Sequence, residues 1–369
     1  MNILIFFVVL VILILVHEFG HFIAAKRSGI RVDEFGIGFP PKLFGKKFGE
    51  TEYTLNLLPI GGFVRIWGED PTSEHYDPDA PDAGRSFVQQ PKYIQALVLV
   101  AGVCMNVLLA YVLFAGAFMI GMPTSATTLE EAAANNIQDV KLYVSSVSPD
   151  SPATETLHPS DEILSLSTSN KSVDSETTLS PETVSAFIRE SEGESVTLSL
   201  SRRGEPVEIT VAPQKGVIAD DPERYAMGST MILAGTERLG LLDALTQAVP
   251  RTYNSLTDIV VGLYRLISGK EELSQVSGPV GIVGLVGDAA ALGFTWLMTF
   301  SAYISLNLAV INLFPFPALD GGRLVFVGIE AITRKPIPPT IATRANQIGF
   351  TLLLLLMLLV TASDIVKLF

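Results

Sequence analysis

The sequence predicts a polytopic α-helical membrane protein with four transmembrane helices, a membrane-associated β-rich loop and an inserted α+β domain. Of its 369 residues, 48% are hydrophobic and only 17% are charged, and the mean hydropathy is +0.41, a balance typical of integral membrane proteins. Four apolar stretches are long enough to cross about 30 Å of hydrocarbon. In residues 124–215, fifteen Asp and Glu outnumber six Lys and Arg, so this segment is expected to be soluble.

Eight segments follow from this pattern. They are the first transmembrane helix (1–28), a cytoplasmic β-rich loop (29–92), the second transmembrane helix (93–122), an extracytoplasmic domain (123–216), an amphipathic helical region (217–290), a third transmembrane segment (291–325), a cytoplasmic loop (326–347) and the fourth transmembrane helix (348–369). The two connections taken as cytoplasmic are rich in lysine and arginine, as the positive-inside rule requires. Both termini and the acidic domain are then extracytoplasmic, and the net charge of −13 disfavours nucleic-acid binding.

The first span opens with the apolar run IFFVVLVILILV. A cleaved signal peptide is the alternative, but it would need basic residues before this run and a small-residue cleavage site after it, and the sequence has neither. The sole cysteine of the sequence, Cys104, lies in the second apolar stretch. Disulfide bonds and cysteine-rich zinc sites are therefore excluded.

The first cytoplasmic connection contains IRVDEFGIGF and ETEYTLNLLPIGGFVRI, in which β-branched and aromatic residues cluster between proline and glycine turns. This pattern predicts a small β-sheet folded against the membrane. Residues 68–91 are acidic and proline-rich, which predicts a surface loop with His75 as a solvated histidine.

The pattern of the acidic domain predicts the order strand, strand, helix, strand and strand. These elements fall within about ninety residues, a normal size for a compact α+β domain. After it, residues 240–268 carry a helical apolar stripe interrupted by Pro250. Such a stripe suits a helix that lies on the membrane surface.

The chemistry is concentrated where the first apolar run ends, in HEFGH. His17 and His21 are one helical turn apart and can both reach one Zn²⁺, while Glu18 can take a proton from a water molecule beside the metal. Ionisable residues inside hydrocarbon cost several kcal/mol unless something binds them. Two surface histidines are the alternative, but here both histidines belong to an apolar helix.

A catalytic zinc usually takes three protein ligands, and Asp320 in INLFPFPALDGGRL is the best third candidate. Pro315 and Pro317 should end the preceding helix, and Gly321 and Gly322 permit a close turn after the carboxylate. Irregular backbone at membrane depth is tolerated where it is buried in protein or lines a watery cavity. An interfacial turn carboxylate is the alternative for Asp320, and the presence of HEFGH favours the metal ligand.

Three motifs, HEFGH, NLFPFPALDGGRL and SGPVGI at 277–282, together resemble the site-2 protease family of intramembrane zinc metalloproteases. The resemblance is to the bacterial type that includes the regulator-of-sigma-E protease, and it covers nearly the whole chain. It implies Zn²⁺ bound by His17, His21 and Asp320, with Glu18 as the catalytic glutamate. It also implies a PDZ-like extracytoplasmic domain, a multi-pass protein of the bacterial inner membrane, and a β-rich loop beside the active site.

The resemblance extends to asparagines and a glycine in the spans. Asn307 and Asn312 match asparagines that precede the family's LDG motif, and Gly102 with Asn106 matches a Gly-x-x-x-Asn pattern in the second span. The chain departs from the family in having room for one PDZ domain where close relatives have two. It departs again at Ser160, which stands in HPSDEIL where a glycine is common; His158 in this segment is expected to be a surface residue.

The expected function is regulated intramembrane proteolysis of pre-trimmed transmembrane proteins in contact with membrane lipid, such as anti-sigma factors or remnant signal peptides, after an upstream site-1-type protease has acted. An edge formed by Gly61, Gly62 and Phe63 is expected to pair with the unwound substrate. Asn307 or Asn312 is expected to hold the substrate backbone or the oxyanion, with interhelical hydrogen bonding as the alternative.

Two functions from other classes compete with proteolysis. A membrane-anchored PDZ adaptor would need the three ligands but no glutamate beside them, so Glu18 favours the enzyme. A metal-ion transporter would need several acidic spans, and the sequence has few acidic residues near its spans beyond Glu18 and Asp320.

Overall fold

The computed structural model describes residues 2–69, 82–174, 179–202, 204–218, 221–270 and 277–366. For Asn2 and Ile60 within these ranges, it describes the backbone but not the side chain. The chain forms two compact units: unit 1 comprises Met1–Ala117 and Leu241–Phe369, and unit 2 comprises Phe118–Gly240. The predicted loop histidine, His75, lies outside the described residues.

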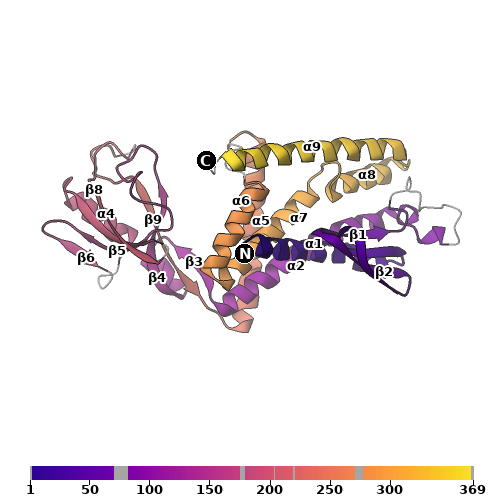
Figure 1. Cartoon of the computed structure of the whole chain (residues 1–369), viewed down its shortest axis with the longest axis horizontal. Helices are drawn as coiled ribbons and strands as arrows, with labels where there is room; N and C mark the ends of the chain where they lie inside the picture. The colour runs from indigo at the N-terminus through magenta and orange to yellow at the C-terminus, as the bar shows by residue number, and fades with distance from the viewer. Residues whose placement is uncertain are drawn as a thin grey trace. The chain divides into compact units, whose positions relative to one another are not determined.

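Unit 1 is mainly helical (Figure 1). Its helices are α1 (Asn2–Arg27), α2 (Lys92–Ile120, which ends in unit 2), α5 (Leu241–Ile267), α6 (Pro279–Leu292), α7 (Phe294–Leu313), α8 (Asp320–Thr333) and α9 (Pro339–Val366). Among the described residues, four helices are long and apolar enough to cross a membrane: α1, α2, α7 and α9. The prediction of four spans is confirmed at this level, and α6 is a shorter apolar helix.

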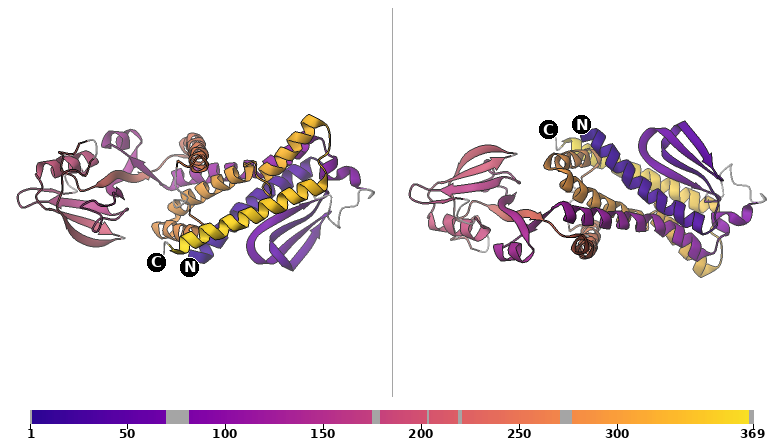
Figure 2. Two further views of the ribbon diagram at one scale, coloured as in Figure 1. Left: turned by 90° about the horizontal axis from the view of Figure 1, so that it is seen from above. Right: turned by 90° about the horizontal axis from the view of Figure 1, so that it is seen from below.

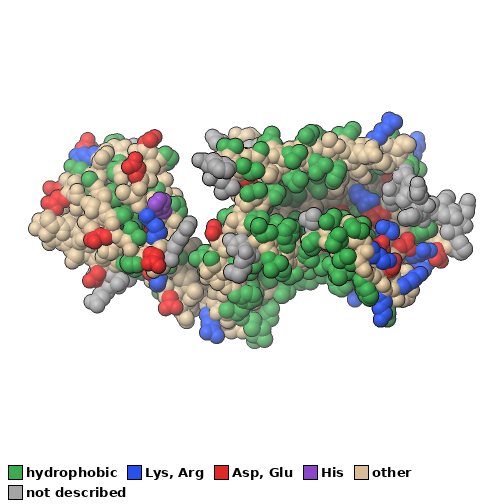
Figure 3. All heavy atoms as spheres, in the orientation of Figure 1, with side chains coloured by type: hydrophobic (Ala, Val, Ile, Leu, Met, Phe, Trp, Pro, Cys, Tyr) green, Lys and Arg blue, Asp and Glu red, His purple; other side chains and the backbone are tan. Residues whose placement is uncertain are grey.

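Hydrophobic and charged side chains occupy different parts of the surface of unit 1, as expected for membrane-spanning helices. Hydrophobic side chains cover its long helices, whereas charged side chains gather at the end that carries the β-rich loop and the connection between α8 and α9 (Figure 3). Exposed apolar side chains on a helix of this length are stable in lipid rather than in water.

The helix α5 runs in a different direction from the spanning helices. It is upright in Figure 1 and is seen end-on in Figure 2, whereas α2 and α9 lie along the long axis in both. Small and polar residues, Ala244, Ala248, Thr252 and Ser255, form its buried face, and Pro250 lies inside it. The Arg251 guanidinium donates a hydrogen bond of 2.6 Å to the Tyr303 hydroxyl of α7.

The predicted β-rich loop is a sheet of two long, irregular strands, β1 (Val32–Phe48) and β2 (Thr51–Ile66). The first part of β1 pairs with the last part of β2, through Val32 with Ile66 and Ile37 with Gly62, while Lys42–Phe48 pairs with Thr51–Asn56. Phe22 of α1 contacts the rings of Phe35 and Tyr53. These aromatic contacts hold the sheet against the first helix.

The turn of this sheet is bound to the C-terminal end of α1 by charge. The Glu50 carboxylate accepts hydrogen bonds from Arg85 at 2.8 and 2.9 Å and from Lys26 at 2.6 Å. Hydrogen bonding to Arg85, followed by Lys26, lowers the pKa of Glu50 to about 2. The β-rich loop is therefore attached to α1 at two places, by aromatic packing and by this ion-pair cluster.

Unit 2 is an α+β domain whose sheet has seven strands within the described ranges. They are β3 (Met122–Ala126), β4 (Ile137–Val147), β5 (Glu162–Ser167), β6 (Ser172–Asp174), β7 (Val196–Arg202), β8 (Glu205–Val211) and β9 (Ser229–Glu237). Their order is β3-β9-β4-β5-β7-β8, with β6 beside β5. The helices are α3 (Leu129–Ala134) and α4 (Pro181–Glu190), and α4 begins at a capping box of Ser180 and Thr183.

The core of unit 2 follows from strand alternation. Val196, Leu198 and Leu200 alternate along β7 and are fully buried, as expected where one face of a strand is covered. They pack with Leu142 of β4 and Phe187 of α4 in one apolar cluster.

Several elements differ from the prediction, which for the acidic domain lacked β3, α3 and β6. β9 falls in residues 217–290, for which only helical structure was expected, and it lies between β3 and β4 in the sheet of unit 2. The expected end of the domain at residue 216 therefore leaves out one strand. In addition, α8 and the start of α9 occupy much of the connection at 326–347 that was expected to be a loop. β9 forms because it pairs with β3 and β4, which are distant in sequence, so the periodicity of its own residues does not predict it.

Candidate active site

Two imidazoles of the candidate site come from α1. His17 and His21 are one turn apart, so their side chains lie on the same face of the helix. Both are buried, with exposed fractions of 7% and 8%. Their ring centroids are 4.7 Å apart, and the two Nε2 atoms are separated by 3.1 Å.

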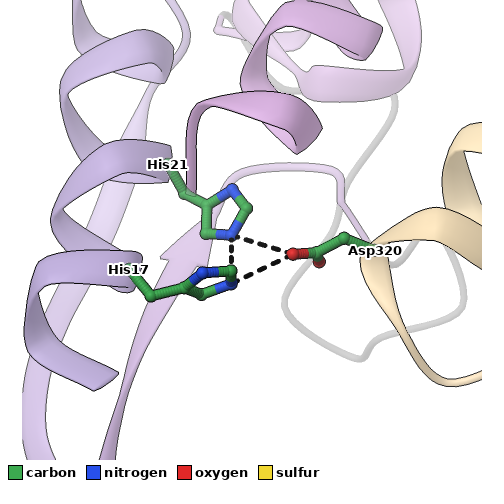
Figure 4. A group of neighbouring side chains, drawn as sticks. All are labelled: His17, His21 and Asp320. Carbon is green, nitrogen blue, oxygen red and sulfur yellow. Dashed lines mark hydrogen bonds and ion pairs between the residues drawn. The ribbon is translucent and has the colours of Figure 1, made fainter. Parts of the chain in front are cut away.

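The carboxylate comes from the other end of the chain. α7 ends at Leu313, the backbone of Phe314–Leu319 is not helical, and Asp320 is the first residue of α8. Pro315 and Pro317 lie in this break, as predicted. The Oδ2 atom of Asp320 lies 3.0 Å from Nε2 of His17 and 3.3 Å from Nε2 of His21. Figure 4 shows the three side chains pointing toward one another.

Glycines allow the helices to come this close. A Cβ atom on Gly20 would lie 2.4 Å from the Ala101 carbonyl oxygen of α2, and one on Gly102 would lie 2.4 Å from Nε2 of His21. In α8, a Cβ on Gly321 would lie 2.3 Å from the carbonyl oxygens of Leu313 and Phe314. The close approach of α1 to α2, and of α8 to the end of α7, therefore requires the absence of a side chain at these points.

Each histidine has a partner for its second ring nitrogen. Nδ1 of His21 lies 2.8 Å from the carbonyl oxygen of Val98, which can only accept a hydrogen bond. His21 therefore carries a proton on Nδ1, and its Nε2 atom faces Asp320 and His17. Nδ1 of His17 lies 3.4 Å from the side-chain amide of Asn106. Val98 and Gly20 were not identified from the sequence, because a backbone acceptor and a packing glycine leave no motif.

Glu18 is half-buried beside this cluster and close to β2. Its Cγ atom would lie 3.8 Å from a Cβ on Gly62. Gly62 and Phe63 pair with Ile37 and Gly36 of β1 on one side. A Cβ on Gly62 would also lie 3.1 Å from the Leu15 side chain, so the face of β2 at Gly62 lies against α1.

The two predicted asparagines differ in position. The amide nitrogen of Asn312 lies 3.5 Å from Nε2 of His17, next to the ligand cluster. The amide of Asn307 instead donates a hydrogen bond of 2.9 Å to the Tyr303 carbonyl of its own helix, and its side chain is exposed. The structure therefore brings Asn312, and not Asn307, to the histidines.

A cavity of about 560 Å³ reaches Asp320 from one side. Its charged and polar lining comprises Glu69, Arg323, Glu330, Thr343, Asn346 and Gln347 together with Asp320. Arg323 forms an ion pair with Glu69, and Lys92 forms one of 2.6 Å with Glu330. This polar lining provides a route for water to a carboxylate that lies among apolar helices.

The donor set fits zinc. Two imidazole nitrogens and a carboxylate oxygen are ordinary zinc ligands, and bonds of about 2.0–2.1 Å in tetrahedral geometry separate ligand atoms by about 3.3 Å. The three separations here are 3.0, 3.1 and 3.3 Å. Three protein ligands would leave a fourth position for water or substrate, which is the arrangement of hydrolytic zinc sites.

Comparisons with known proteins identify the family of the chain. The model of the family described as peptidase family M50 matches residues 5–356. A Clostridium perfringens protein is 37% identical over 96% of this chain and 95% of its own length. The zinc metalloprotease RasP of Oceanobacillus iheyensis is 30% identical, over 97% of both chains. The regulator of sigma-W protease RasP of Bacillus subtilis is 29% identical, over 99% of this chain and 98% of its own.

Among solved structures, the PDZ domain of a Listeria innocua SdrC-like protein matches 25% of the chain at 20% identity with a TM-score of 0.20. A similarity at this level does not bear on the fold of unit 2.

Proposed function

The chain belongs to peptidase family M50, and from this premise we propose that it hydrolyses peptide bonds within transmembrane segments, with His17, His21 and Asp320 as zinc ligands and Glu18 as the catalytic glutamate. The chain is a zinc metalloprotease and a multi-pass membrane protein. The observation that carries the assignment of residues is the convergence of two Nε2 atoms from α1 and one carboxylate oxygen from α8.

Each residue has a chemical task in this proposal. Zinc, when bound, polarises the scissile carbonyl and makes water nucleophilic near neutral pH. Glu18 takes a proton from the attacking water and returns it to the leaving amine. The Asn312 amide, which lies at the edge of the ligand cluster, donates to the oxyanion without bringing a charge into lipid.

The substrate binds as an added strand. A transmembrane helix hides its amides in internal hydrogen bonds, so it must unwind before cleavage. The segment Gly61–Gly62–Phe63 pairs with β1 on one side only in the described part of the chain, and Gly62 lies close to Glu18; both support strand addition at this edge.

The substrates are membrane proteins with a short extracytoplasmic remainder. One relative is named a regulator of sigma-W protease, and by analogy the substrates of this chain are membrane-bound anti-sigma factors or remnant signal peptides. An upstream site-1-type protease trims them first. Unit 2 acts as a PDZ-like size gate that excludes untrimmed substrates, although Ser160 replaces the common glycine before β5.

The orientation follows from charge. The lysines and arginines of the β-rich loop and of the connection between α8 and α9 lie on the cytoplasmic side of the inner membrane. Unit 2 and both termini lie outside the cytoplasm. The direction of α5, across that of the spanning helices, suits a helix along the outer membrane surface in contact with lipid.

The decisive experiment measures cleavage and zinc content together. Wild type, Glu18→Gln and the exposed control Glu182→Gln are reconstituted in liposomes with a tagged single-span substrate already trimmed outside. Glu18→Gln should keep its zinc but lose about 100-fold or more of the rate, since general-base catalysis contributes on the order of 10²–10⁴. The control and wild type should cleave alike, and a chelator should stop both.

The competing function is an adaptor that binds partners without cleaving them. Zinc-loaded, folded wild type that cleaves no member of a panel of trimmed single-span substrates would favour the adaptor. Equal cleavage by Glu18→Gln and wild type would remove Glu18 from the mechanism.

A further inference from the structure

Asn106, in the middle of α2, is a buried polar residue to which the proposed mechanism gives no task. Its exposed fraction is 0%. Its amide nitrogen lies 3.4 Å from Nδ1 of His17, and its amide oxygen has no hydrogen-bond partner among the residues that the structure describes. A buried unpaired amide oxygen costs about 1–3 kcal/mol, so a residue kept here is expected to have a function.

The protonation of His17 decides what Asn106 must present to it. Without metal, Nε2–H of His17 donates to Asp320 and Nδ1 accepts from the Asn106 amide, as the distances of 3.0 and 3.4 Å allow. A histidine that binds metal through Nε2 carries its proton on Nδ1 and needs an acceptor there. A side-chain amide can supply either group, because half a turn about its terminal bond exchanges nitrogen and oxygen.

We propose that Asn106 is a positioning residue for His17, and that its amide oxygen accepts the Nδ1 proton of His17 when Nε2 binds zinc. This inference rests on the proposed zinc site. In that state the amide oxygen acquires a partner and the His17 ring is held in its ligating orientation. His21 already has the equivalent contact, from its Nδ1 to the Val98 carbonyl at 2.8 Å. Both ligands would then be oriented by α2.

Contacts of the α2 backbone near Asn106 keep this residue beside His17. The Ser305 hydroxyl of α7 donates a hydrogen bond of 2.8 Å to the backbone carbonyl of Asn106. Gly102, one turn earlier, allows the histidines to approach α2. Ser305 contacts the backbone of Asn106 and not its amide, which makes Ser305→Ala a matched control for packing between α2 and α7.

The test measures zinc binding by the full chain in detergent. Wild type, Asn106→Leu, Asn106→Asp, Ser305→Ala and His17→Ala are titrated with zinc against a chromophoric chelator, and the d–d spectrum of the cobalt(II) forms is recorded. Loss of a residue that orients a metal ligand typically lowers metal affinity 10–100-fold. Asn106→Leu should show that loss and an altered cobalt spectrum. Asn106→Asp keeps an acceptor and should recover most of the affinity, and Ser305→Ala should bind as wild type does.

The outcomes separate this inference from the proposed function. Wild-type affinity and spectrum for Asn106→Leu, with binding lost in His17→Ala, would overturn the role of Asn106 and leave the zinc site standing. No zinc binding by wild type, or equal binding by His17→Ala, would overturn the zinc site itself. If Asn106→Leu does not elute as a folded species, Asn106→Ser, whose hydroxyl is too short to reach His17, is measured in its place against the same expectations.

Discussion

Single glycines decide whether the ligand cluster can form. Gly102 is in contact distance of both histidines, since a Cβ there would lie 2.4 Å from Nε2 of His21 and 2.8 Å from Cε1 of His17. No such crowding surrounds Gly328 in the middle of α8, where a Cβ would have no neighbour within 4 Å in the described structure. The two glycines therefore provide a matched pair.

We predict that Gly102→Ala weakens zinc binding about tenfold or more. The added methyl group must displace a ligand ring, and overpacking costs about 1–3 kcal/mol, of which 1.4 kcal/mol corresponds to tenfold. Gly328→Ala should bind zinc as wild type does and gain up to about 1 kcal/mol of helix stability. Chelator competition and thermal unfolding of both variants measure these effects; equal zinc affinities would show that the ring has room to move.

Ser160 has a backbone conformation that suits glycine. It is exposed and has a φ of +75°, in the left-handed region that costs an L-residue about 1–2 kcal/mol. This conformation explains why the PDZ-like pattern that the sequence resembles commonly has a glycine at this position. A change there tests the backbone alone, because the side chain is exposed.

We predict that Ser160→Gly stabilises unit 2 by up to about 1 kcal/mol, after allowance for the greater entropy of unfolded glycine. Ser160→Ala keeps the strained conformation and should give no such gain. Hydrogen exchange of the β4 and β5 amides in the full chain compares the three proteins. Slower exchange in Ser160→Ala than in Ser160→Gly would contradict the argument from backbone strain.

At the scale of elements, charged side chains join strands and turns that local patterns leave unconnected. Asp161, just before β5, is 1% exposed and accepts hydrogen bonds of 2.8 and 2.7 Å from Arg202 at the end of β7. Burial raises the pKa of Asp161, but the hydrogen bonds from Arg202 and from the His158 N–H outweigh burial and leave the pKa below its ordinary value.

We predict that unit 2 loses stability on acidification through this pair. A carboxylate whose pKa is lowered on folding contributes stability above the unfolded pKa of about 4, and the contribution is lost as the pH falls through the folded pKa. Protection of β5 and β7 amides should therefore decrease below about pH 4. In Asp161→Asn it should already be lower at pH 7 and change less between pH 7 and pH 3; a wild-type pH profile in that variant would exclude Asp161 as the source.

At the scale of the whole molecule, the insertion between α2 and α5 is a domain with its own core. Its sheet includes β3 and β9, whose paired residues run from Met122 with Glu237 to Ala126 with Leu233. Removal of residues 124–215 alone would leave β9 without the strands that flank it. A deletion that respects the sheet must remove residues 122–237.

We predict that the chain lacking residues 122–237 still binds zinc and cleaves trimmed substrates, and that it also cleaves substrates with a folded extracytoplasmic domain. Unit 1 keeps its helices and ligands, whereas the proposed size gate is gone. The smaller deletion of 124–215 should aggregate, because β9 would expose an unpaired strand. Cleavage of a substrate series of increasing extracytoplasmic length measures the gate, and unchanged length selectivity in the larger deletion would rule it out.

Local sequence patterns predicted the apolar spans, the helix break and two of the three proposed zinc ligands. An apolar run long enough to cross hydrocarbon needs no partner to be recognised, and His17, Glu18 and His21 lie within one turn and a half of a single helix. Pro315 and Pro317 end α7 through their own chemistry, since proline removes a backbone donor. These features depend on residues that are neighbours in sequence, so the sequence alone determined them.

Only the tertiary structure decided how distant parts meet. It brings Asp320 to 3.0 Å from a histidine 303 residues earlier in the chain, inserts β9 between β3 and β4, and directs Asn312 rather than Asn307 toward that histidine. It also supplies Val98 and Asn106 as partners for the two ligand rings. Sequence periodicity describes which face of a helix is apolar, but these contacts arise from packing between helices and pairing between strands, which residues far apart in the chain determine together.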